Sequence, residues 1–415
     1  MLLWKKPFFF ITLVSLAITA HAEDNDMHMH GMYGRYAMTQ ESSGTSWQPA
    51  STPFTGYMMM TEQGMMMLQG FANVIYDHQG GPRGGELTYS TSMAMFMAQK
   101  DLAQGTVGFR SMLSLDPLMG AGGYPLLFQT GETADGHTPL IDRQHPHDAV
   151  MELAGTYSLP LSEKNAVFIY AGWPGEPALG PPNFMERWSG MVIPEAPLGH
   201  HWLDSTHITY GVITLGYVLN KVKLEFSAFN GREPDQRRWN MESPRLTSQA
   251  IRLSYNPTDD WALQASYGRL KSPEQIHPNV NTHRTTLSAI YNRPLQGDDN
   301  WQTTLAWGQN ANHPGHTLNA YLLESSVNFR LTHTFFARAE HLQEDELFPD
   351  TSPFADEIFN VNKLSLGYLY EFSNWHHAKP GVGALVSTYA IPSIVQTAYG
   401  SRPFSYMLFA RITIV

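Results

Sequence analysis

The chain has 415 residues, a formal net charge of −11 and no cysteine. The negative charge argues against a nucleic-acid partner, and the lack of cysteine excludes both a disulfide framework and a lipid anchor on cysteine. Charged residues make up only 15% of the chain and aromatic residues 12%, whereas about 25% charged residues are usual in a soluble domain.

Residues 1–22 are typical of a secretory signal peptide. Lys5 and Lys6 supply a positive n-region, the apolar run "PFFFITLVSLAIT" follows, and Ala20-His21-Ala22 forms an A-x-A cleavage site. The run of ~13 apolar residues is shorter than the ~20 that a spanning helix needs. We therefore expect export across the inner membrane and cleavage after residue 22.

Residues 23–60 form a tail that is rich in methionine and histidine and that we expect in the periplasm. Its first part, "DMHMHGMYGRYAM", gives five candidate metal ligands, which are Met27, His28, Met29, His30 and Met32. Thioethers are soft ligands that select Cu(I), and imidazole adds affinity for Cu(II). The alternative is a disordered leader of unusual composition. The methionines at 65–67 and 93–97 alternate within predicted strands, so we interpret those as packing.

Residues 61–415 predict a transmembrane antiparallel β-barrel. In "KVKLEFSAF", Leu224 and Phe226 alternate with Lys223 and Glu225, which puts apolar and polar groups on opposite faces of a strand. No apolar stretch long enough for a spanning helix follows the signal peptide, and a closed barrel is the other structure that a bilayer permits. We expect about 16 strands (14 to 18), near 65–76, 87–98, 105–114, 150–159, 165–172, 207–219, 221–229, 248–256, 260–270, 283–292, 300–308, 318–330, 332–342, 361–372, 381–390 and 403–415.

The connections between these strands alternate in length. Long links follow the odd-numbered strands, and short links such as "LSEKN" and "NPTDD" follow the even-numbered ones. Outer-membrane barrels have long extracellular loops and tight periplasmic turns, and an even strand count returns both termini to the periplasm. The pattern favours the outer membrane of a Gram-negative bacterium over a soluble β-sandwich.

Two long loops, 115–149 and 173–206, are candidates to narrow the lumen, because they are rich in Pro and Gly yet carry apolar residues throughout. They contain two groups of potential metal ligands, which are His145, His147 and Asp148, and His200, His201, Asp204 and His207. Imidazole and carboxylate suit divalent zinc, nickel, iron or copper. Pro146 would aim His145 and His147 the same way in a strand-like segment.

A hydrogen-bonded scaffold is the alternative interpretation of these loops. In that scaffold Arg143 and Arg187 would pair with Glu176, Glu186 or Glu195. We expect no catalytic residues, because Ser205 lies too close in sequence to its neighbours for a Ser-His-Asp triad and no G-x-S-x-G motif accompanies it. The tail and the histidine-rich loops are expected on opposite sides of the membrane, too far apart to share one site.

Several blocks resemble those of a largely uncharacterised family of proteobacterial outer-membrane proteins. They include "DRQHPHD", "PGEPALGPPNFM", "APLGHHWLDSTHITYGV" and "FNGREPD", and the resemblance spans most of residues 41–410. It implies a fold class and a location rather than a mechanism. A Met/His-rich leader ahead of a barrel is also similar in plan to the copper-resistance protein B family, and this architectural similarity implies copper handling.

These observations predict an outer-membrane channel linked to transition-metal homeostasis, with copper as the expected metal, and not an enzyme. One alternative is a porin-like or siderophore-type solute channel in which Arg83, Arg232, Arg237 and Arg238 select anions. A second alternative is an enzyme acting on envelope lipids. No cofactor is required, and copper ions are the candidate bound metal. Expected partners are outer-membrane lipid, metal ions or a small solute, a periplasmic metal-handling protein, and two further copies in a homotrimer.

Overall fold

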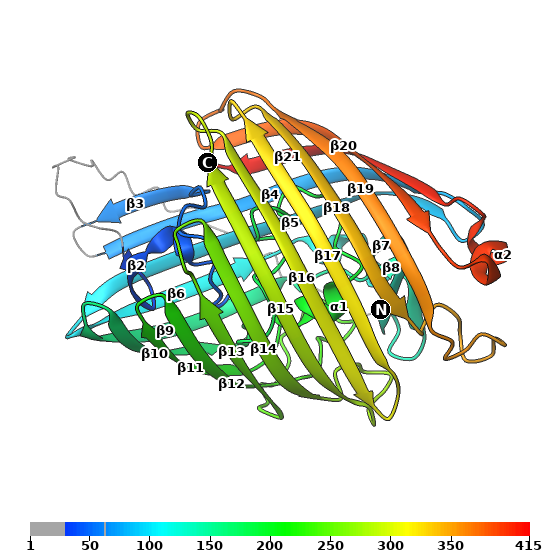
Figure 1. Cartoon of the computed structure of the whole chain (residues 1–415), viewed down its shortest axis with the longest axis horizontal. Helices are drawn as coiled ribbons and strands as arrows, with labels where there is room; N and C mark the ends of the chain where they lie inside the picture. The colour runs from blue at the N-terminus through cyan, green and yellow to red at the C-terminus, as the bar shows by residue number, and fades with distance from the viewer. Residues whose placement is uncertain (1–29, 62–63) are drawn as a thin grey trace, which may run out of the picture.

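The computed structural model describes residues 30–61 and 64–415, so the signal peptide and the ligands Met27, His28 and Met29 lie outside the described residues. Within the described part, no helix has the length and apolar character needed to cross a membrane. Nearly all of the regular structure is antiparallel β-strand (Figure 1).

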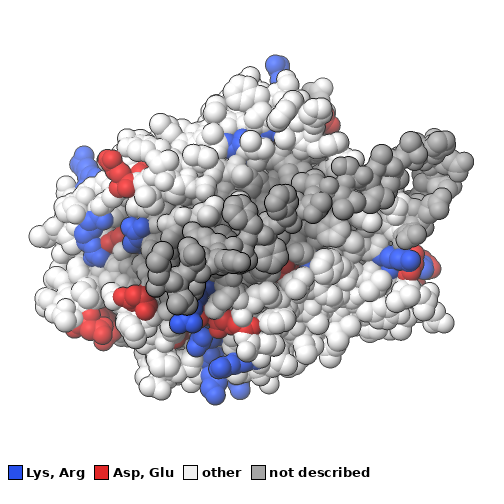
Figure 2. All heavy atoms as spheres, turned by 180° about the vertical axis from the view of Figure 1, so that it is seen from behind, with Lys and Arg blue, Asp and Glu red and all other residues white. Residues whose placement is uncertain are grey.

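The strands alternate between an outward apolar face and an inward polar face. In β12, Leu224 and Phe226 are 48% exposed, whereas Lys223 and Glu225 are fully buried. The same alternation recurs along the wall, and in the view from behind few charged side chains appear on the uncovered part of the surface (Figure 2). An apolar exterior around a polar interior is the arrangement of a membrane barrel.

Seventeen strands enter a closed barrel in which each neighbouring pair is antiparallel. Because β3 and β21 pair with successive parts of β4, through Met67 to Met58 and then Phe71 to Thr413, the wall is sixteen strands around. The wall strands are β3 (Tyr57–Thr61), β4 (Gly64–Gln79), β5 (Gly85–Leu102), β6 (Gly105–Leu113), β9 (Val150–Ser162), β10 (Asn165–Gly172), β11 (Val212–Leu219), β12 (Val222–Phe229), β13 (Ser248–Tyr255), β14 (Trp261–Lys271), β15 (Asn281–Pro294), β16 (Asn300–His313), β17 (Thr317–Phe329), β18 (His333–Glu344), β19 (Phe359–Glu371), β20 (Ala378–Ala390) and β21 (Phe404–Ile414).

The remaining short elements do not belong to the wall. They are β1 (His30–Gly31), β2 (Gly34–Ala37), β7 (Tyr124–Thr133), β8 (Pro139–Gln144), α1 (His200–Leu203), α2 (Gln396–Tyr399) and the 3-10 turns η1 (Met38–Gln40), η2 (Asp116–Met119), η3 (Ser205–His207) and η4 (Ser393–Val395). The prediction of an all-β antiparallel barrel of about sixteen strands is confirmed. The strand expected at 207–219 begins instead at Val212, because residues 205–207 form η3 within the preceding loop.

Both long loops fold into the lumen. The first, between β6 and β9, forms the β7–β8 hairpin, and every residue of β7 is buried. The second leaves the wall after β10 and carries α1 to β16, where Asn310 donates a hydrogen bond to the backbone oxygen of His201 at 3.0 Å. It reaches β17, seven positions around the wall from β10. The second loop therefore crosses the barrel.

Part of the N-terminal tail also lies inside the barrel. Arg110 of β6 donates to the backbone oxygens of Ser42 and Gly44, Arg252 of β13 donates to Thr45, and Gln302 of β16 donates to the hydroxyl of Thr52. These contacts hold residues 42–52 along the inner wall. The second loop and this segment form an apolar core within the lumen, in which tail residues such as Trp47 pack with wall and loop residues, and the two loops pack together in a second core.

Candidate functional site

Buried ion pairs fasten the second inward loop to the wall. Arg187 pairs with Glu324 of β17 at 2.5 Å and with Asp204 at 3.4 Å, and Glu324 also pairs with Arg338 of β18 at 3.1 Å. Farther along the loop, Glu195 pairs with Lys363 of β19 at 2.6 Å. The expected partners of Arg187, which were Glu176, Glu186 or Glu195, are wrong, because Arg187 points across the lumen to the wall.

The two loops meet at a row of five imidazoles. Ring centroids are 5.3 Å apart between His147 and His207, 5.2 Å between His207 and His200, 5.5 Å between His200 and His201, and 5.7 Å between His201 and His145. His145 and His147 come from the first loop and the other three from the second. The sequence groups therefore form one site, although they are separated by more than fifty residues.

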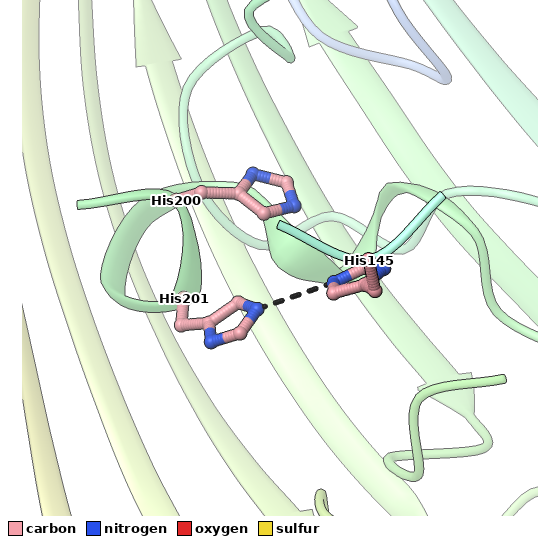
Figure 3. Close-up of side chains that lie close together, drawn as sticks. All are labelled: His145, His200 and His201. Atoms are coloured by element: carbon pink, nitrogen blue, oxygen red, sulfur yellow. Dashed lines mark hydrogen bonds between the residues drawn. The ribbon is translucent and has the colours of Figure 1, made fainter. Parts of the chain in front are cut away.

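His145, His200 and His201 lie close enough to hold one metal ion. Each offers a ring nitrogen, and these three nitrogens lie within 4.8 Å of one another. The Nε2 atoms of His145 and His201 are 3.4 Å apart, and Figure 3 shows the two rings pointing at each other with His200 beside them. Gly131 makes room for this arrangement, since a Cβ on it would come within 2.4 Å of His201 Nδ1.

Two carboxylates complete the group. Glu132 Oε2 is 3.6 Å from His145 Nδ1, and Glu233 Oε2 is 3.8 Å from His201 Nε2. Glu132, His145 and Glu233 offer ligand atoms that also lie within 4.8 Å of one another. Sequence reasoning missed both glutamates, because they lie in β7 and in the loop after β12. No local spacing links them to the histidines.

The buried imidazoles are held in the neutral form that binds metals. Burial and the neighbouring His201 lower the pKa of His145 to about 3, and burial lowers the pKa of His200 well below its usual value. Asp204 Oδ1 is 2.7 Å from His200 Nδ1, so that nitrogen donates and the Nε2 atom is left to face a ligand. A carboxylate behind a histidine is the usual means of orienting a metal ligand.

His147 and His207 lie at the other end of the row. His147 Nδ1 is 2.7 Å from Asp116, and His207 Nδ1 is 2.8 Å from the backbone oxygen of Asp204. Among the described residues, the Nε2 atoms of both rings are buried without a hydrogen-bond partner. The condition for His145 and His147 to point the same way is not met, because residues 145–148 are not a strand, and the two rings meet different partners.

The other sequence candidates lie apart from this row. Asp148 accepts from Tyr210 at 2.7 Å and pairs with Arg238 at 3.3 Å. His30 is exposed in β1, and Met32 is fully buried against the wall glycine Gly108.

Three of the four arginines proposed to select anions are already paired. Arg83 pairs with Asp142 at 2.7 Å, Arg232 pairs with Glu242 at 3.1 Å, and Arg238 pairs with Glu132 and Asp148. Arg237 is exposed. Because carboxylates neutralise three of these charges, the four arginines do not form an anion-selecting row.

Comparisons with known proteins support the fold. No protein-family model and no curated protein matches the chain. Among solved structures, OmpF of Salmonella typhi in complex with daunomycin aligns with a TM-score of 0.53 and 9% identity, covering 86% of this chain and 100% of that one. OprB of Pseudomonas putida in its high-pH structure aligns with a TM-score of 0.52 and 9% identity, covering 85% and 94%. The chain therefore has the fold of these outer-membrane proteins.

Proposed function

We propose that this protein is a porin-like channel of the Gram-negative outer membrane whose lumen is closed by its own inward loops. The observation that carries the proposal is the closed sixteen-strand wall with an apolar exterior and a lumen crossed by loops that ion pairs hold in place. A wall of this size encloses an aqueous channel unless loops fill it. Passage of a solute then requires the loops to move.

Planar-bilayer recording tests the channel. The wild-type protein should conduct little, and a variant with residues 178–206 replaced by a short Gly-Ser linker should open pores of large, steady conductance. The wall strands pair without this loop, so far-UV circular dichroism should show that the variant keeps its β-structure. A variant barrel that is intact but carries no current contradicts the proposal.

A second function, transition-metal handling, is favoured by the group of His145, His200, His201, Glu132 and Glu233. Three imidazoles and two carboxylates suit zinc, nickel or copper(II), and they come from both inward loops and the loop after β12. An ion held here would join these three segments. Copper homeostasis, through metal passage or metal-controlled loop movement, is the form of this function that the methionine-rich tail supports.

Equilibrium dialysis against Zn(II) or Cu(II) tests this function. Purified protein in detergent should bind one ion per chain at the histidine group, and His201→Ala should weaken that binding by more than 100-fold, because outer partners alone are worth 10–100-fold. His137→Ala is the matched control, since His137 is exposed on the β7–β8 hairpin. Equal binding by wild type and His201→Ala removes this function.

The remaining expectations stay predictions. They concern signal-peptide cleavage, the homotrimer and the periplasmic metal-handling partner. An enzyme acting on envelope lipids is the less favoured alternative, because Ser205 accepts a hydrogen bond from Arg284 at 3.1 Å. Its hydroxyl is thereby engaged by a group other than a histidine.

A further inference from the structure

Methionine supplies most of the buried apolar side chains on the lumen face of β4, β5 and β6, beside polar ones such as Asn73, Asp77 and Arg110. Six buried side chains of these strands are Met65, Met67, Met93, Met95, Met97 and Met112, alongside one isoleucine and no leucine or valine. The lumen faces of membrane barrels are usually polar, and a core needing only apolar volume favours leucine, isoleucine and valine over methionine. The choice of thioethers on this face therefore calls for a reason other than packing.

Five methionines surround one small cavity, which we call the thioether cavity. Its volume is about 60 Å³, and Met38, Met67, Met95, Met97 and Met191 line it. They come from the tail, two wall strands and the second loop, and Met67 lies directly opposite Met97 in the β4–β5 register. Side chains opposite each other in an antiparallel pair have Cβ atoms about 4.5–5.5 Å apart, so both sulfurs can reach one ion.

Glu41 is the carboxylate of the cavity that can face a cation. Arg110 and Glu186 also line the cavity, but they pair with each other at 3.4 Å, and the same guanidinium donates a hydrogen bond to the Met95 sulfur at 3.4 Å. Glu41 is 9% exposed, and its Oε2 atom is one of the buried atoms without a hydrogen-bond partner in the described part of the chain.

The thioether cavity adjoins both the end of the barrel and the histidines. A neighbouring cavity of about 220 Å³ shares Phe54 and Met191 with it and is also lined by the C-terminal residue Val415. A third cavity, of about 30 Å³, is lined by Met191, His145 and His147. Met38 of the tail and the two histidines line different cavities, and Met191 borders both of them.

We propose that the thioether cavity binds a soft monovalent cation, Cu(I), before the histidine group along one route through the lumen. This inference deepens the transition-metal function proposed above and rests on it. Thioethers are among the ligands that select Cu(I), and Glu41 supplies the counter-charge. An ion that moves from one site to the other passes Met191.

The test compares two variants that differ in the face of the strands. Met67→Leu/Met95→Leu/Met97→Leu removes three thioethers of the cavity. The outward variant, Met59→Leu/Met66→Leu, removes two methionines that lie opposite each other on the outer face and are 42% and 37% exposed. Leucine for methionine conserves volume, so packing changes little. The full-length protein is titrated with Ag(I), a redox-inert probe for Cu(I), and then anaerobically with Cu(I) against a competing chelator.

The cavity variant should lose one equivalent of Ag(I) and of Cu(I), or bind it at least 10-fold more weakly, and the outward variant should match wild type. Equal binding by the two variants overturns the proposal and leaves the methionines as packing. If limited proteolysis shows that the cavity variant is misfolded, the single variant Met97→Leu decides by the same criterion. Zn(II) binding by His201→Ala is scored separately, so failure of the histidine function is distinguishable from failure of the thioether site.

Discussion

Glu324→Gln is expected to release the second inward loop from the barrel wall. Glu324 lies between Arg187 and Arg338, accepts from Ser189 at 3.0 Å, and is fully buried, as are both guanidinium groups. Glutamine keeps the size of the side chain but leaves two buried positive charges without their shared partner. Removing one partner of such a buried ion pair lowers the free energy of unfolding by about 3–5 kcal/mol.

Hydrogen–deuterium exchange of residues 183–206 measures this release. Peptides of the loop should exchange faster in Glu324→Gln than in wild type, and single-channel conductance should rise with them. Glu163→Gln is the control, because Glu163 pairs with Arg35 at the surface and its side chain is 83% exposed. An exposed ion pair contributes little, so this variant should exchange as wild type does.

A double variant separates lost charge balance from lost packing. Arg187→Met in the Glu324→Gln background removes one of the two charges that lost Glu324, together with its remaining pair to Asp204, while keeping a long side chain. Because the cost of breaking a buried pair is mostly that of the charge left behind, the double variant should recover part of the loop protection. Exchange that is faster still in the double variant would show that the hydrogen bonds of Arg187 matter more than its charge.

The wall could be predicted from the sequence because each wall strand carries its own signal. Leu224 and Phe226 must face lipid and Glu225 must not, so the alternation fixes the face of every residue once one is placed. The alternation of long and short links supplied the second signal, because it indicates which end of each strand faces the outside of the cell. Both signals are local, and they need no knowledge of which residues meet across the barrel.

The sequence suggests that the loops fold inward, but it does not determine where they attach. Attachment depends on pairs such as Arg187 with Glu324 and Glu195 with Lys363, which are 137 and 168 residues apart. The same holds for the site, where spacing revealed His200 and His201 but not Glu233. Such partners are chosen by which strand the loop reaches across the lumen, and a single sequence does not contain that information in local form.

The tail illustrates the same limit at the N-terminal end. The sequence places Met38 only within a methionine-rich leader, and its position beside Met191 follows from contacts of residues 42–52 with four different wall strands. Interpreting Met67 and Met97 as packing is reasonable for two residues in predicted strands. Only the closed barrel shows that they face the same small cavity as three other thioethers.

Raising the pH from 6.5 to 8 is expected to loosen the start of the second loop through Glu176. Burial raises the pKa of this carboxyl to about 8, although Arg252 opposes the shift, and its Oε1 accepts from Ser43 at 2.9 Å. The pKa of Glu176 is higher in the folded protein than in the unfolded chain. The stability that protonated Glu176 contributes to the folded state is therefore complete below about pH 4.5 and is lost as the pH rises through 8. The loss is about 1.4 kcal/mol per pH unit in this window.

The variant Glu176→Gln tests this assignment, since glutamine mimics the protonated carboxyl and does not titrate. The buried histidines do not interfere, because burial lowers the pKa of His145 to about 3 and of His200 and His207 well below their usual value, so these rings stay neutral throughout the window. Exchange of the peptide spanning residues 173–186 is compared between wild type and variant at each pH, which cancels the intrinsic effect of pH on exchange. Wild type should lose roughly 2 kcal/mol of protection relative to Glu176→Gln between pH 6.5 and 8. A constant difference across this range would mean that Glu176 is already ionised at pH 6.5, with Arg252 outweighing burial.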